Sequence, residues 1–152
     1  MRVSAKTDYA LRAAVELAAA PEGTPVKGER LSASQSIPLR FLENILLQLR
    51  HAGIVESRRG AEGGYRLARP PAEITLADVI RAIDGPLAGV SGRRPETLDF
   101  KGHSEPLREV WVAVRASLRG VLENVSLADV AAGELPDTVR ELTSEPDAWV
   151  SH

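Results

Sequence analysis

The sequence predicts a mostly α-helical protein that contains one small β-hairpin. Aromatic residues make up only 4% of the 152 residues, and Ala, Leu and Val supply most of the apolar side chains, a composition that favours helices. Apolar residues recur at intervals of three and four over several long segments, as on one face of a helix. The exception lies at 54–67, where two short strand-like runs flank the turn sequence "RRGAEG".

Three helices are expected before the hairpin. Ser4 can cap the first helix, and the segment "PEGTP" (21–25) ends it. A short second helix is expected within 26–37. Pro38 suits the first turn of the third helix, and Gly53 suits its end. The apolar stripe of this third helix consists of Phe41, Leu42, Ile45, Leu46 and Leu49. Its polar positions, mainly off that stripe, are Arg40, Glu43, Asn44 and Gln48.

After the strands at 54–57 and 64–67, a fourth helix is expected near 74–85, capped by Thr75 and ended by Gly85. These elements make a first domain over 1–85. Residues 86–103 have no sustained periodicity and are expected to form a loop. A long helix and a short closing helix are expected within 104–133. The acidic tail, 134–152, is expected to be partly disordered.

The long helix has an apolar stripe that must be buried. It can fold back on its own domain or pair with the same helix of a second copy. The stripe consists of Leu107, Val110, Trp111, Val114, Leu118, Val121 and Leu122.

The composition excludes several kinds of function. The chain has no cysteine, which excludes disulfides, thiolate metal sites and cysteine nucleophiles, and fits a cytoplasmic protein. No run of about 18 apolar residues predicts a membrane span. "GAEGG" follows a strand but opens no helix, so it is not a nucleotide-binding loop, and no spacing indicates an enzyme. The nearest approach to a metal site is His103 beside Asp99 and Glu105, which fits an ordinary surface histidine better, so no metal or cofactor is expected.

Charge is distributed unevenly along the chain. Residues 1–70 contain 11 Lys and Arg against 7 Asp and Glu, a net charge of +4. Residues 71–152 contain 8 against 14, a net charge of −6. The basic half is suited to binding a polyanion such as nucleic acid. An excess of four positive charges is also small enough to arise from chance variation in composition.

Three helices followed by a two-stranded ribbon make the plan of a winged helix–turn–helix domain. The third helix is then the element that fits the major groove of DNA. Arg58 and Arg59 lie where the glycine-rich turn can approach a phosphate backbone. Two other interpretations remain at this point: the arginines belong to a solvated turn, or the domain binds a protein.

A long stretch, "LRFLENILLQLRHAGIVESRRGAEGGYRLARPPAEITLADVIRAIDGPL", resembles the Rrf2 family of bacterial winged-helix transcription regulators. The opening "MRVSAKTDYALRAAVELA" is also similar to the start of that family. The resemblance covers residues 1–87 well and continues more loosely through Trp111 and 125–131, where the family has its dimerising helix and a short helix behind it. It implies a cytoplasmic homodimer on double-stranded DNA, bound to a pseudo-palindromic operator.

The same resemblance implies which residues contact DNA. In the recognition helix they are Pro38, Arg40, Phe41, Glu43 and Asn44, and in the wing they are Arg58, Arg59 and Gly60. Arg40 and Asn44 have the chemistry to bind guanine and adenine edges respectively. Glu43 can accept a hydrogen bond from cytosine N4, can repel phosphate and so tune selectivity, or can be an ordinary solvated helix residue. Phe41 fits a place in the core better than a contact with DNA.

The chain departs from the family in one loop. Many sensing members have three cysteines after "GPL" that hold an iron–sulfur cluster, whereas here the segment "AGVSGRRPETLDFKGHSEPL" has none. A small-molecule or protein effector, or no effector, is expected in place of a cysteine-ligated cluster. We therefore expect a homodimeric repressor of transcription. The alternative is an interaction module for a partner enzyme, with DNA binding secondary.

Overall fold

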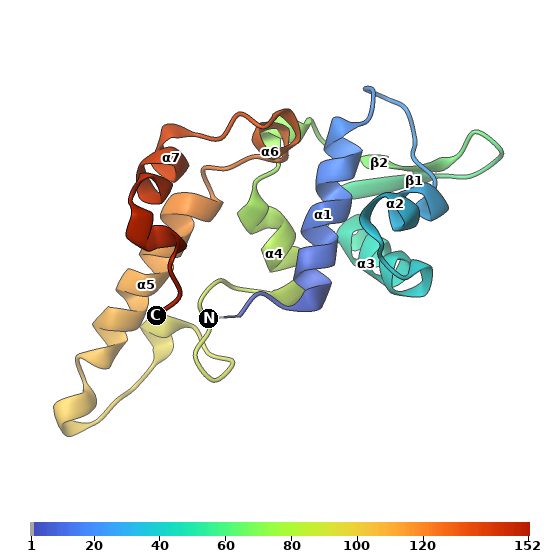
Figure 1. The fold of residues 1–152 in the computed structure, drawn as a ribbon. Coiled ribbons are helices and arrows are strands. Elements are labelled where there is room, and N and C mark those ends of the chain that lie inside the picture. The colour runs from blue at the N-terminus through green and yellow to red at the C-terminus, as the bar shows by residue number, and fades with distance from the viewer. Residues whose placement is uncertain (1) are drawn as a thin grey trace.

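The computed structural model describes residues 2–152 and is mostly helical with one two-stranded antiparallel sheet (Figure 1). The first part of the chain contains α1 (Ala5–Ala19), α2 (Gly28–Gln35), α3 (Leu39–His51), β1 (Val55–Arg58), β2 (Gly64–Leu67) and α4 (Leu76–Asp84). The second part contains α5 (Leu107–Leu122), α6 (Leu127–Ala132) and α7 (Asp137–Ser144). Single 3-10 turns lie at Pro71–Glu73 (η1), Pro95–Thr97 (η2), Gly102–Ser104 (η3) and Pro146–Trp149 (η4). The order of elements confirms the expected winged helix–turn–helix.

Helix α1 lies at the centre of the domain and packs against α3, α4 and α6. Ser4 caps it as expected, because its Oγ accepts a hydrogen bond of 3.1 Å from the backbone N–H of Thr7. One stripe of α1 is buried, at Ala10, Ala13, Ala14 and Leu17. Small alanine side chains let the neighbouring helices approach closely, so the bundle around α1 is compact.

Helix α3 buries Leu42, Ile45, Leu46 and Leu49 completely, as its periodicity predicts. The placement of Phe41 in the core was wrong, because its side chain is 46% exposed. The reason is geometric: Phe41 precedes Leu42 by one residue, which rotates the side chain by about 100° around the helix. Pro38 occupies the cap position immediately before α3 rather than its first turn.

The hairpin has the register Val55↔Leu67 to Arg58↔Gly64, with β1 one residue later than expected. It is fixed to the body by a bridge between Val26 and Tyr65, whose backbone N–H and carbonyl groups exchange two hydrogen bonds of 2.8 Å. Gly64 permits this approach, because a Cβ atom there would lie 2.6 Å from the Val26 carbonyl oxygen.

Helices α4 and α6 begin side by side. Each starts with a capping box, Thr75 with Asp78 and Ser126 with Asp129, and Thr75 pairs with Ser126 in a short antiparallel bridge. Leu127 of α6 is completely buried in the same core as α1 and α3. The winged-helix core is thus completed by a segment more than forty residues beyond α4.

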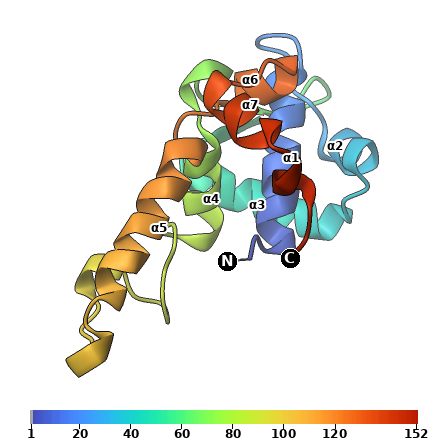
Figure 2. The ribbon, with the colours of Figure 1, turned by 60° about the vertical axis from the view of Figure 1, so that its left-hand side comes forward.

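Helix α5 departs from this body and extends away from α1 (Figures 1 and 2). It begins at Leu107, three residues later than the expected helix, and none of its residues is buried. Val110 is 49% exposed and Val114 is 37% exposed. Its main contacts within residues 2–152 are with η2 of the preceding loop and with α4.

The tail and the loop are more regular than the sequence suggested. Helix α7 and η4 lie in the tail that was expected to be partly disordered. Within this tail the Trp149 indole N–H donates a hydrogen bond of 2.8 Å to the Thr143 carbonyl. The loop between α4 and α5 contains η2 and η3, and it buries Leu87, Pro95 and Leu98. The loop thus has three buried apolar side chains, and its η2 turn packs on α5.

Candidate nucleic-acid interface

The outer face of α3 carries the polar residues expected to contact bases. Arg40, Glu43 and Asn44 are exposed near the N-terminal end of the helix, beyond Pro38. Arg40 forms no ion pair with any other of residues 2–152. Asn44 accepts a hydrogen bond of 3.3 Å from Gln48, which leaves its amide N–H groups free. A guanidinium and an amide with free donors are thus presented together on one helix face.

Lys6 joins this face from α1, a contribution that the sequence pattern does not predict. Together with Arg40, Phe41 and Asn44 it lines a shallow cavity of about 320 Å³. The ring of Phe41 stands edge-on to that of Tyr9, with ring centroids 5.8 Å apart. No motif marks Lys6, since only the packing of α1 on α3 brings it here. The face therefore contains two cations around an exposed aromatic ring.

A cation–π contact supports the aromatic pair from behind. The Arg12 guanidinium lies 4.8 Å from the centroid of the Tyr9 ring and is paired with Asp8 at 3.0 Å. Arg12 also donates 3.0 Å to the carbonyl of Gln35 at the end of α2. These contacts fix α1 and α2 relative to α3, so the outer face of α3 has a rigid support.

The turn of the hairpin presents Arg58 and Arg59, which are exposed and form no ion pair with any other of residues 2–152. Gly60 has φ +103°, and its carbonyl accepts 3.0 Å from the N–H of Gly63. A Cβ atom on Gly63 would lie 2.2 Å from the Arg58 carbonyl oxygen, so this turn requires glycine. The glycines give a narrow tip with two free cations.

The base of the hairpin is electrically different from its tip. Arg66 pairs with Glu56 on the opposite strand, so its charge is neutralised. Arg50 at the end of α3 donates 3.2 Å to Ser57, a contact that links the helix to β1. Among the arginines of the hairpin itself, the two without an ion pair inside residues 2–152 are therefore Arg58 and Arg59 at the tip. Helix α3 and the hairpin lie at the same end of the molecule (Figure 1).

The α5 stripe expected to mediate dimerisation is partly exposed, because three of its seven residues are exposed and four are half-buried. Five of its seven residues line a groove of about 990 Å³ that also includes residues of α1, α4 and α7: Val110, Val114, Leu118, Val121 and Leu122. Leu107 is exposed, and Trp111 is half-buried and does not line the groove. Trp111 directly follows Val110, and this one-residue step turns its side chain about 100° around the helix, away from the groove.

A helical core with a projecting hairpin and a recognition-type helix with free polar groups defines the class of winged helix–turn–helix DNA-binding proteins. The Rrf2 family model, described as "Iron-dependent Transcriptional regulator", matches residues 3–133. The chain therefore belongs to the Rrf2 family of transcriptional regulators.

Individual relatives agree with this assignment. The chain is 52% identical over 145 residues to Rv1287 of Mycobacterium tuberculosis, provisionally named an HTH-type transcriptional regulator, covering 95% of this chain and 90% of the relative. It is 34% identical over 132 residues to the HTH-type transcriptional regulator CymR of Bacillus subtilis, covering 87% and 91%. The solved structure of that global cysteine regulator matches with a TM-score of 0.75 and 32% identity, covering 88% of this chain and 98% of that one. The structure of T. potens IscR matches with a TM-score of 0.68.

The iron named in the family description does not fit the residues present here. The chain lacks cysteine, and within residues 2–152 no three His, Asp or Glu side chains gather as a metal site would require. The loop after α4 instead contributes Arg94 and Glu96 to a cavity shared with arginines of α4 and α5. Guanidinium groups are always protonated and do not ligate iron, so we derive no step through an iron centre.

A membrane-spanning role has no helix to support it among residues 2–152, because none there is both long enough and apolar enough to cross a bilayer.

Proposed function

We propose that this regulator binds DNA sequence-specifically as a homodimeric repressor on a pseudo-palindromic operator. The observation that carries the proposal is the pairing of two surfaces at one end of the molecule. Helix α3 offers Arg40 and Asn44 with free donors, and the hairpin offers Arg58 and Arg59 without ion pairs. The first pair suits base edges in the major groove, and the second suits phosphates beside the minor groove.

The dimer is supported by the apolar groove beside α5. No residue of α5 is buried, and its stripe contains three exposed apolar side chains, Leu107, Val110 and Val114, which a partner surface can cover. A second copy of α5 provides a matching stripe about a twofold axis, as closed symmetric dimers require. Two linked recognition helices then contact half-sites about one helical turn apart, which gives the discrimination that a genome demands.

We infer repression because a bound dimer can block a promoter without any additional contact. A dimer that occupies an operator overlapping a promoter excludes RNA polymerase without any further contact. This mechanism needs only a DNA-binding unit and self-association, roles that we assign to α3 with the hairpin and to α5 respectively. Repression therefore requires no surface on the regulator that recruits RNA polymerase.

The test is a selection of DNA fragments by the purified protein, followed by sequencing and gel shifts at fixed salt. We expect one palindromic motif, and retention of the DNA upstream of the protein's own gene. The double variant Arg40→Ala/Asn44→Ala should lose the motif while keeping weak general DNA binding, with Arg140→Ala as an exposed control. If no fragment is enriched, sequence-specific binding is excluded, and the interaction-module alternative gains support.

A further inference from the structure

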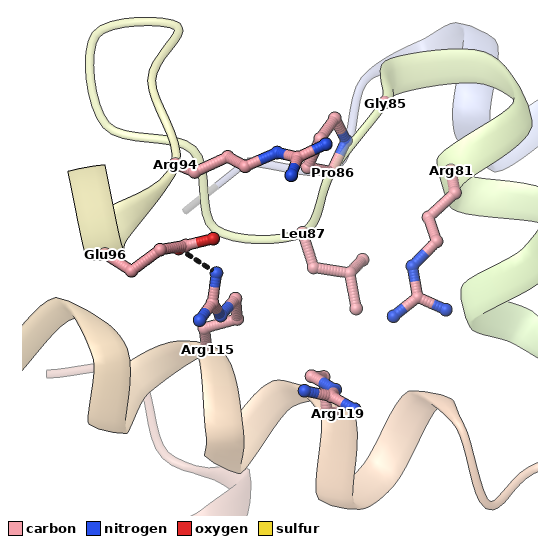
Figure 3. A pocket seen from close by; sticks show the side chains of 8 residues that line it. All are labelled: Arg81, Gly85, Pro86, Leu87, Arg94, Glu96, Arg115 and Arg119. Carbon is pink, nitrogen blue, oxygen red and sulfur yellow. Dashed lines mark hydrogen bonds and ion pairs between the residues drawn. The ribbon is translucent and has the colours of Figure 1, made fainter.

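A second cluster of arginines surrounds a cavity far from the proposed DNA-binding surface. The cavity, about 460 Å³, lies between the end of α4, the following loop and α5 (Figure 3). Arg81, Arg94, Arg115 and Arg119 line it, with Gly85, Pro86, Leu87 and Glu96. In Figure 1, α5 and this loop lie at the end of the molecule opposite the hairpin, so the function of this cluster is not explained by the DNA contacts.

Two carboxylates only partly neutralise these arginines. Glu96 pairs with Arg115, and Glu123 pairs with both Arg81 and Arg119. The pKa of Glu96 is lowered mainly by a hydrogen bond from the backbone N–H of Glu96 itself, and to a smaller extent by the hydrogen bond from Arg115. Hydrogen bonds from Arg81 and Arg119 lower the pKa of Glu123. Both carboxylates are therefore ionised at neutral pH, and four guanidinium groups against two carboxylates leave an excess of two positive charges.

Arg94 is the residue without a partner. Its guanidinium makes no ion pair and donates no side-chain hydrogen bond within residues 2–152. In Figure 3 it extends from the loop toward Pro86, and Arg81 from α4 and Arg119 from α5 line the same cavity. Three structural elements thus direct guanidinium groups into one concave site, an arrangement that suits bidentate recognition of an oxyanion.

We propose that this cavity binds a small organic anion with at least two oxyanionic charges, such as those of a phosphorylated or polycarboxylic metabolite. Its size is within the range of metabolite pockets, about 300–1,000 Å³. Pro86 and Leu87 supply an apolar wall for the carbon part of such a ligand. An anion with two charges balances the two unmatched cations, and Arg94 gains the partner it lacks.

The position of Leu87 connects this cavity to the groove beside α5. Leu87 is buried and lines both spaces, and α5 contributes Arg115 and Arg119 to the cavity but Val114 and Leu118 to the groove. An anion that draws Arg94 toward Arg119 shifts the loop against α5 and so alters the groove. This coupling to DNA binding rests on the proposed function, because it assumes that the groove is the dimer surface.

The binding step is tested without DNA, by calorimetric titration with pyrophosphate and with citrate at an ionic strength kept constant with sodium chloride. At least one probe should saturate with one anion per chain. Arg94→Gln should weaken that binding about tenfold, since a charge-assisted bidentate pair is lost. Glu96→Gln should strengthen it, because an internal competitor for Arg115 is removed. Arg108→Gln on the exposed face of α5 is the control and should change nothing.

The outcomes separate the two claims. If neither probe saturates, or if Arg94→Gln binds as well as the unmodified protein, the anion site is wrong. Gel shifts on selected DNA with the saturating probe should show an affinity change of about threefold or more that Arg94→Gln abolishes. An unchanged affinity would refute the coupling while the anion site stands. Failure to bind any selected DNA without the probe would refute the proposed function but not the calorimetric result.

Discussion

Helices α3 and α5 have the same kind of amphipathic sequence, yet their apolar stripes differ in burial. In α3 every residue of the central stripe is completely buried, at Leu42, Ile45, Leu46 and Leu49. In α5 no residue is buried, and Val110 and Val114 remain exposed. Helix α3 is surrounded by α1, α2, α4 and β1, whereas α5 packs mainly on the short η2 turn and α4.

This difference shows that an apolar stripe predicts burial but not the surface that buries it. For α3 the partner surfaces lie within the same domain, so the stripe stabilises the monomer. For α5 the stripe faces an open groove, and under the proposed function a second copy of the chain supplies the surface that covers it. Variants that separate these two contributions test the comparison directly.

The largest effect is expected where charge is placed on the α5 stripe. The double substitution Val114→Glu/Leu118→Glu should give monomers that retain their helical signal, because these side chains are not needed by the core. Operator affinity should fall about a thousandfold or more, since one recognition helix gains little over general DNA binding. Sedimentation, circular dichroism and gel shifts measure the three quantities. Arg108→Glu on the polar face is the control, and a double variant that stays dimeric would place the interface elsewhere.

The next effect concerns monomer stability. Leu46→Ala in α3 should lower the free energy of unfolding by about 2–5 kcal/mol, because it leaves a cavity in the core. Leu107→Ala in α5 removes the same atoms from a side chain that is 42% exposed, and should change stability by less than about 0.5 kcal/mol. Urea denaturation is best measured in the monomeric double variant, so that dimerisation adds nothing. Equal losses at both positions would show that α5 is part of the monomer core.

Features that depend on neighbouring residues could be predicted from the sequence. The cap by Ser4, the capping residue Thr75 and the stop at Gly85 each need only a few consecutive residues, and the structure has all three. The hairpin and the stripe of α3 were predicted for the same reason, except at Phe41. Phe41 lies at the border of the stripe, so the burial of its side chain depends on which neighbouring helix packs against that border.

Features that depend on packing could not be predicted. Lys6 lies beside the outer face of α3, and Arg81 and Arg119 line the same cavity, only because helices distant in sequence pack together. Helix α7 was missed because Val139 and Leu142 are its only large apolar residues, although Pro136 followed by Asp137 is a recognisable helix start.

A smaller effect is expected on the polar face of α3, where the comparison with α5 extends to charged residues. Arg40→Ala or Asn44→Ala should cost about 1–3 kcal/mol on the selected site and much less on random DNA, because each loses a contact to a base edge. Arg108→Ala on α5 should cost nothing on either DNA. Competition gel shifts give both affinities. Equal losses on the two DNAs would assign Arg40 and Asn44 to phosphate contacts.

The smallest effect is expected at the hairpin, where a free and a paired arginine can be compared. Arg59→Ala removes an unpaired charge at the tip, so binding should weaken similarly on all sequences, and the dependence of log affinity on log salt should become shallower by about one unit. Glu56→Gln/Arg66→Gln is the matched control, and it should leave that slope unaltered because it removes a pair of charges that already cancel. Affinities between about 50 and 200 mM salt suffice for the measurement. An unchanged slope for Arg59→Ala would mean that the tip does not touch phosphate. Equal changes for both variants would mean that the whole hairpin, rather than its unpaired tip, lies against the DNA.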